Sequence, residues 1–96
     1  MLRLFSNPEV AQQNAYKYLG ADAVLFKSTR KGKKYMIYDK FNNKFVHFGQ
    51  FGVMDFTKHG NLNKKMNYLN RSGGIKGNWK ENPYSANNLS RNILWK

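Results

Sequence analysis

Two runs of basic side chains stand out as the chemistry-bearing part of this chain, and the chemistry they suit is phosphate binding. One run surrounds a glycine, and the other follows a histidine in the second half of the chain. Their members are Arg30, Lys31, Lys33 and Lys34 in the first run and Lys64, Lys65, Arg71 and Lys76 in the second. Such groups neutralise backbone phosphates of a nucleic acid and release its counterions. We expect them to form one phosphate-binding surface, extended by Lys80 and Arg91.

The overall charge supports this expectation. The 96 residues include 17 Lys and Arg but only 5 Asp and Glu, a formal net charge of +12. A field of this sign attracts polyanions or acidic protein surfaces before any specific contact forms. Lys outnumbers Arg, which favours point-charge attraction over bidentate reading of bases. The expected partner is nucleic acid, in the form of double-stranded DNA, bound without sequence preference; the alternative is a solvated surface that serves only solubility.

Candidate catalytic and metal-binding groups are few. The chain has no cysteine, and zinc usually takes three or four ligands, so His47 and His59 with scattered carboxylates make a weak set. A magnesium-dependent nuclease would cluster its carboxylates. Residues 72–74 lack the lysine and spacing of a phosphate-binding loop. We expect no enzymatic activity and no cofactor, and a nuclease using His59 as a base is the least favoured alternative.

The aromatic content, 16% of the residues, argues for a folded core rather than disorder. Six aromatics in or beside the expected strands could instead stack on single-stranded bases. They are Tyr35, Tyr38, Phe41, Phe48, Phe51 and Phe56. Because a small sheet needs most of its aromatics for packing, we expect them to be mainly core residues. Trp79 and Trp95 are expected to anchor a loop and the C-terminal end.

The elements that must position these residues begin with a helix and a sheet. Asn7 and Pro8 predict a helix start, and Gly20 predicts its end. Residues 23–26, 35–38 and 44–48 are strand-like, and residues 29–33 and 39–43 are typical of turns. The order predicts an N-terminal helix followed by a three-stranded antiparallel sheet.

Two C-terminal helices should follow. Asp55 and Thr57 are expected to cap a turn at His59, which leads into a helix over residues 62–71. In that helix the spacing of Leu62, Met66 and Leu69 predicts a shared apolar face, with Lys64, Lys65 and Arg71 projecting elsewhere.

Ser85 is expected to cap the last helix, with Leu89, Ile93 and Leu94 inward and Arg91 outward. No segment approaches the ~20 apolar residues of a membrane span. Residues 1–96 are therefore expected to form a single small basic domain of the α+β class.

A series of short motifs runs in fixed order along the chain. They are Lys33-Lys34-Tyr35-Met36, His47-Phe48-Gly49, Asp55 to His59, Lys64-Lys65 with Tyr68-Leu69 and Arg71, Ile75 to Trp79, Asn82 to Ser90, and Leu94-Trp95. Over residues 16–96 this series resembles a poorly characterised family of small basic proteins of giant and other large double-stranded DNA viruses. Where those relatives carry an acid and an arginine pair after the histidine, this chain has Asn61 and Lys64-Lys65, which weakens a fork-shaped phosphate contact.

The resemblance implies a viral protein of the virion, or of the host cytoplasm or viral factory during infection, and transfers no catalytic residue. Together with the charge it favours a virion-associated nucleic-acid-binding protein for genome packaging or organisation. The runner-up is a minor capsid or core structural protein that docks on acidic shell proteins. Gathering of Phe5, Phe41, Phe51 and Trp95 into one exposed apolar area would favour that alternative. The oligomeric state stays open.

Overall fold

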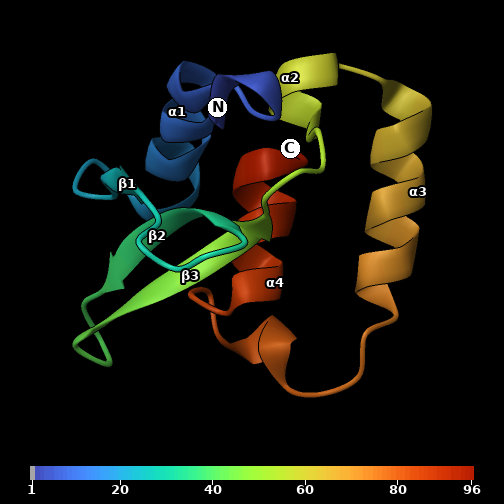
Figure 1. Ribbon diagram of the computed structural model, residues 1–96. Helices are drawn as coiled ribbons and strands as arrows, with labels where there is room; N and C mark the ends of the chain where they lie inside the picture. The colour runs from blue at the N-terminus through green and yellow to red at the C-terminus, as the bar shows by residue number, and fades with distance from the viewer. Residues whose placement is uncertain (1) are drawn as a thin grey trace.

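The computed structural model describes residues 2–96, and its α+β architecture confirms the expected order of an N-terminal helix, a three-stranded antiparallel sheet and C-terminal helices (Figure 1). The elements are η1 (Leu2–Leu4), α1 (Pro8–Leu19), β1 (Leu25–Lys27), β2 (Lys33–Asp39), β3 (Lys44–Gln50), α2 (Phe56–His59), α3 (Leu62–Gly73), η2 (Trp79–Glu81), α4 (Ala86–Leu89) and η3 (Ser90–Leu94). The short α2 is the expected turn at His59, with the Asp55 side chain accepting from the Thr57 amide.

The N-terminal helix α1 begins and ends as its sequence predicts. The side chain of Asn7 accepts a hydrogen bond from the Val10 amide, and Gly20 ends the helix at a φ of 114°. Ala11 and Ala15 are fully buried on one side, because their small side chains let α1 approach η3 closely. The side-chain amide of Asn14 donates to the Ile93 carbonyl at 2.8 Å and fixes this contact.

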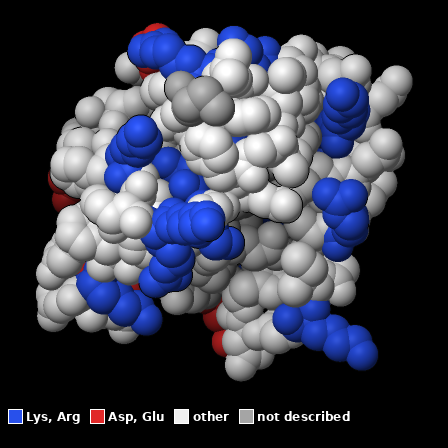
Figure 2. Space-filling view, viewed as in Figure 1, with Lys and Arg blue, Asp and Glu red and all other residues white. Residues whose placement is uncertain are grey.

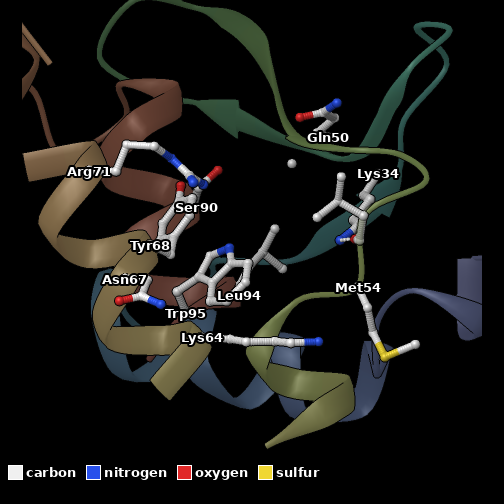
Figure 3. A pocket seen from close by; sticks show the side chains of 12 residues that line it. Lys34, Gln50, Met54, Lys64, Asn67, Tyr68, Arg71, Ser90, Leu94 and Trp95 are labelled. Atoms are coloured by element: carbon white, nitrogen blue, oxygen red, sulfur yellow. Dashed lines mark hydrogen bonds between the residues drawn. The ribbon is translucent and has the colours of Figure 1, made fainter. Parts of the chain in front are cut away.

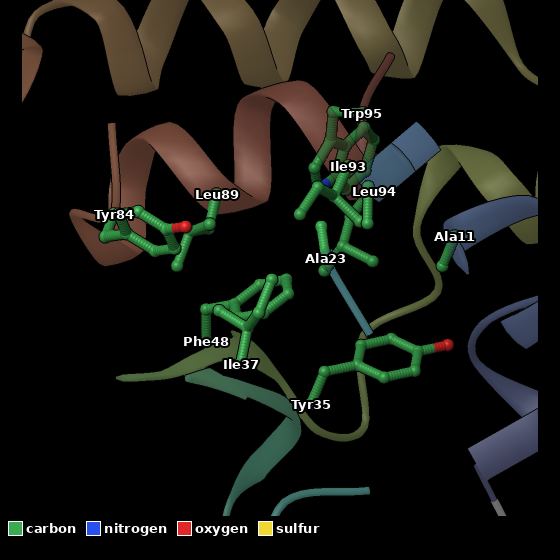
Figure 4. Packing of buried hydrophobic residues seen from close by; sticks show 11 residues of the cluster. Ala11, Ala23, Tyr35, Ile37, Phe48, Tyr84, Leu89, Ile93, Leu94 and Trp95 are labelled. Carbon is green, nitrogen blue, oxygen red and sulfur yellow. The ribbon is translucent and has the colours of Figure 1, made fainter. Parts of the chain in front are cut away.

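The sheet has the order β1-β2-β3, with both pairs antiparallel. Side chains of a strand alternate between the two faces, and we call the face that carries Tyr35, Ile37 and Phe48 the inner face. Figure 4 shows these three beneath the C-terminal helical segment, where they meet Leu89, Ile93 and Leu94 in the core cluster.

The C-terminal segment covers the inner face as one helical rod with a change of pitch. Ser85 caps α4 by accepting from the Asn88 amide at 3.2 Å, and the chain continues into the π-helical turn η3. Leu89, Ile93 and Leu94 are buried, as predicted. Gly49 is required where η3 meets β3, since its φ is +82° and a Cβ there would lie 2.7 Å from Leu94 Cδ1.

The packing of α3 differs from the prediction. Of the expected apolar face, Leu69 packs against the core, whereas Leu62 and Met66 are 66% and 55% exposed. The helix instead packs through Tyr68, whose ring stacks on Trp95 with 4.3 Å between centroids and 11° between planes. The indole of Trp95 offers Tyr68 a large flat apolar surface, and packing on this surface sets the rotation of α3 about its axis.

The aromatic residues also divide in a way the sequence does not reveal. Tyr35 and Phe48 are buried, but Tyr38 is 44% and Phe41 72% exposed, which corrects the expectation of core positions for these two. Trp79 is a loop anchor, as expected: its Nε1 donates to the Ile75 carbonyl at 2.7 Å, and its carbonyl accepts from Ser85 Oγ at 2.8 Å. Within residues 2–96, none of the helices combines the length and apolarity needed to cross a bilayer.

Candidate nucleic-acid interface

A groove of about 490 Å³ lies beside α3, and its other walls come from the end of β3, the segment that follows it and the C-terminal segment. Lys64, Asn67 and Arg71 line one wall, because residues three and seven apart lie on the same side of a helix. Figure 3 shows these three side chains on α3, and Gln50 across the opening. The stacked rings of Tyr68 and Trp95 also line the groove. Besides the buried Lys34, it combines two exposed cations, amide groups and an aromatic surface, a composition that suits a phosphorylated ligand with planar groups.

Carboxylates are absent from the residues that line this groove. The acidic side chains described in residues 2–96 are largely engaged elsewhere: ion pairs join Arg3 to Glu9 at 2.8 Å, Lys40 to Asp22 at 3.2 Å, and Lys34 to Asp55 at 2.9 Å. The buried Asp39 accepts from the backbone amides of Phe41 and Asn42 in the β2–β3 turn. The charges of Lys64 and Arg71 therefore meet no opposing charge in the groove wall.

The β1–β2 hairpin carries the second group of cations on the same side of the molecule. Arg30 and Lys31 are exposed at the turn, and Lys33 pairs in register with Gln50, a residue of the groove wall. The Phe51 amide donates to the Gly32 carbonyl at 2.9 Å and ties the turn to the segment after β3. Figure 2 shows basic side chains over the hairpin and along α3 on one face, with acidic atoms only near its margins.

Lys34 also lines the groove, but its charge is buried and already paired, which contradicts its prediction as a phosphate contact. The side chain is only 2% exposed, and Nζ donates to Asp55 Oδ2 at 2.9 Å, to the Phe5 carbonyl at 3.3 Å and to the Val53 carbonyl. Burial lowers the pKa of Lys34, while the hydrogen bond and charge of Asp55 oppose that change. A buried ammonium needs such partners, so Lys34 joins three segments of the fold and has no donor left for a phosphate.

Two other predicted contacts have structural partners. The Arg91 guanidinium donates to the Leu69 carbonyl at 2.7 Å and to Ser72 Oγ at 2.6 Å, so it fastens α3 to η3 and does not point outward as expected. Lys65 lies on another side of α3 from Lys64; its Nζ donates to the Lys96 carbonyl at 2.9 Å and sits 4.7 Å from the Phe56 ring centroid.

The remaining predicted contacts, Lys76 and Lys80, are exposed in the segment after α3, and Lys80 lies over the Trp79 ring at 5.5 Å. Of the predicted set, the structure thus brings Lys64 and Arg71 together in the groove, beside the hairpin residues Arg30, Lys31 and Lys33. Sequence reasoning missed Gln50, Asn67 and the Tyr68–Trp95 surface. Only Asn67 had a detectable signal, its position between Lys64 and Arg71 on one helical stripe.

The two histidines lie on different elements. His47 on β3 is hydrogen-bonded through Nδ1 to Ser28 Oγ at 2.7 Å, and burial, Arg30 and Lys33 lower its pKa. His59 accepts from the Asn61 amide at 2.9 Å and so locks the turn before α3, as expected; burial and Lys64 lower its pKa. In the described part of the chain, no three His, Asp or Glu side chains gather as a set that could hold a metal ion.

The chain belongs to DUF5754, a family of unknown function, whose model matches residues 23–72. No curated protein and no solved structure matches the chain. The matched region runs from β1 into α3, so it contains the hairpin cations and the α3 wall of the groove. It leaves out α1 and the C-terminal segment that supplies Trp95. The resemblance to proteins of large DNA viruses stays a prediction.

Proposed function

We propose that this protein binds nucleic acid through the phosphate backbone, without sequence preference, using the groove beside α3 and the adjoining hairpin. The observation that carries the proposal is the position of Lys64 and Arg71 in a groove whose lining contains no carboxylate. Arg30, Lys31 and Lys33 on the same side extend the positive surface beyond the groove.

The spacing of Lys64 and Arg71 fits the phosphate backbone of a nucleic acid. Seven residues of α-helix separate Lys64 from Arg71, a rise of about 10 Å. Duplex DNA carries one charge for about every 1.7 Å of its axis, so the two side chains can meet different phosphates. Lys64 supplies a point charge, whereas Arg71 presents a planar fork that can engage two oxygens of one phosphate. Asn67 lies between them and can donate to a phosphate or sugar oxygen.

The biological role we propose is packaging or organisation of the genome of a large DNA virus, which needs affinity for DNA of any sequence. This role depends on the motif resemblance and the charge. The runner-up, docking on acidic shell proteins, would be favoured by one exposed cluster of four aromatics. Those aromatics are dispersed instead: Phe5 packs on Phe51 with 5.4 Å between centroids, Phe41 packs on Tyr84, and Trp95 is buried.

The test is binding to a random-sequence duplex of about 30 base pairs, followed by fluorescence anisotropy across a salt series. The expected affinity falls steeply with salt. Replacing Lys64 and Arg71 together by Gln should weaken binding to every duplex sequence alike and reduce the slope of log K against log salt by about two, since each contributes one phosphate contact. A sample with magnesium should leave the duplex uncut.

The matched control combines Lys17→Gln on the exposed side of α1 with Lys58→Gln on α2. This pair removes two positive charges from the chain but none from the groove. It should leave the salt slope close to that of the parent protein. An equal loss in the control pair and in the groove pair would mean that net charge alone binds the duplex, and the groove would then not be the site.

A further inference from the structure

We propose that the outer face of the sheet is a second binding surface, which stacks on the unpaired bases of single-stranded nucleic acid. The outer face is the one opposite the buried Tyr35, Ile37 and Phe48. It presents Phe26 from β1, Tyr38 from β2 and Phe45 from β3. This inference rests on the proposed function in that the ligand is nucleic acid, but it names a different surface and a different form of the ligand.

The three rings form a continuous exposed platform across all three strands. Tyr38 is the register partner of Phe45, and their ring centroids are 5.4 Å apart; Phe26 reaches Phe45 with 6.0 Å between centroids. They are 47%, 44% and 45% exposed in chain order. Each ring thus keeps much of its surface free, and both contacts are edge-to-face. Such a surface offers π-faces to flat, apolar groups.

Polar and cationic side chains continue the platform toward the β1–β2 turn. Met36 and His47 are register partners in the next row of the outer face, and Phe26 pairs with Met36. The turn begins beside this row, because Ser28 Oγ is hydrogen-bonded to His47 Nδ1 at 2.7 Å and accepts from the Arg30 amide at 3.0 Å; Arg30 and Lys33 also help to lower the pKa of His47. Cations for phosphates therefore lie at the end of a row of rings for bases, the combination that single-strand binding surfaces use.

The surroundings of the platform suit an anionic ligand that carries flat groups, which is the chemistry of single-stranded nucleic acid. Asp22 lies in a hollow beside Phe26 and Tyr38, but it is paired with Lys40 at 3.2 Å. The buried Asp39 is engaged by the turn that follows β2. An anionic ligand therefore meets little unpaired negative charge there. The bases must be unpaired, because bases inside a duplex stack on each other and cannot offer their faces to a flat sheet.

The experiment compares three probes on the full chain: an oligothymidine of about 15 nucleotides, an abasic backbone of equal length and the duplex used above. We expect the oligothymidine to bind several-fold more tightly than the abasic backbone. Phe45→Leu should weaken oligothymidine binding about fivefold or more, because one base loses its stacking partner. It should leave the abasic backbone and the duplex almost unaffected. Equal affinities for the two single strands, or no effect of Phe45→Leu, would overturn the proposal.

Two further variants separate stacking from general apolar contact. Tyr38→Phe keeps the ring and should keep the affinity for oligothymidine, whereas Tyr38→Leu should lose it. Phe41→Leu removes an exposed ring that packs on Tyr84 outside the platform, and it should behave like the parent protein. Thermal melts of each variant check that the fold is intact. If Tyr38→Leu binds as well as Tyr38→Phe, the platform does not stack on bases.

Photo-crosslinking gives a direct readout. An oligonucleotide with 5-iodouracil should crosslink to Phe26, Tyr38 or Phe45, identified by mass spectrometry of the peptides. Crosslinks confined to Trp79 or Trp95 would place the bases elsewhere and overturn the proposal. So would concentration-dependent self-association that Phe45→Glu abolishes, because a second copy would then cover the platform. The two proposals can fail separately. If the Lys64 and Arg71 substitutions left duplex binding unchanged while Phe45→Leu still weakened oligothymidine binding, the groove would not be the duplex site, and the platform would remain the single-strand site.

Discussion

The two faces of the three-stranded sheet carry similar residues and serve different ends. On the inner face Tyr35, Ile37 and Phe48 are at most 3% exposed, whereas the aromatics of the outer face are close to half exposed. The difference comes from one neighbour: the α4–η3 segment covers the inner face, and nothing equivalent covers the aromatics of the outer face within residues 2–96. Aromatic side chains therefore stabilise the fold on the inner face and are available to a ligand on the outer face.

The largest expected effect tests this division directly. Phe48→Ala should lower the free energy of unfolding by about 3–5 kcal/mol, because it opens a cavity in a fully buried site. Phe45→Ala, three residues earlier on the other face, should cost less than about 1 kcal/mol, since its ring already contacts water. Urea denaturation of both variants measures the difference. Similar losses for the two would mean that the outer face belongs to the core.

A second prediction concerns the two adjacent lysines at the start of β2. Lys34→Met should destabilise the protein by about 3 kcal/mol, because it leaves the buried Asp55 carboxylate without its cation. Lys33→Met, at the neighbouring half-buried position, should change stability by less than about 0.5 kcal/mol and weaken duplex binding instead. Thermal melts and anisotropy on both variants separate the two roles. A stable Lys34→Met protein with weakened duplex binding would return Lys34 to the phosphate surface.

Local features of this fold could be predicted from the sequence, and features set by distant contacts could not. The caps at Asn7, Asp55 and Ser85 act on amides two or three residues away, so residue type and position were enough. The alternation of the strands predicts two faces but does not say which one a helix will cover. For that reason Tyr38 could not be distinguished from Tyr35.

The candidate site was predictable only in part for the same reason. Lys34 and Lys33 are adjacent and chemically identical, yet the partners that bury Lys34 come from Phe5, Val53 and Asp55, far along the chain. The rotation of α3 is set by Trp95, which lies well beyond the end of that helix. Charge alone identified the basic surface, whereas the groove depends on tertiary packing that no local pattern encodes.

The smallest expected effect concerns the two histidines, one on the outer face of the sheet and one packed against Trp95. His47 lies on the outer face, and His59 packs against Phe56 and Trp95 with its Nε2 buried and without a hydrogen-bond partner in the described residues. The folded-state pKa of each is below the ordinary value, so the unfolded chain binds these protons first. Stability should be constant above a pH of about 6.5 and should fall as the pH drops below it.

Thermal melts between about pH 7.5 and pH 5.5 should show a small fall in Tm from this source. His59→Gln should remove more of the acid-induced loss than His47→Gln, because protonation of His59 also breaks the bond that its Nδ1 accepts from the Asn61 amide. Groups that are common to both variants contribute equally and cancel in the comparison. If His47→Gln removed the larger share, the positive charges of Arg30 and Lys33 near His47 would outweigh the burial of His59 in setting the acid sensitivity.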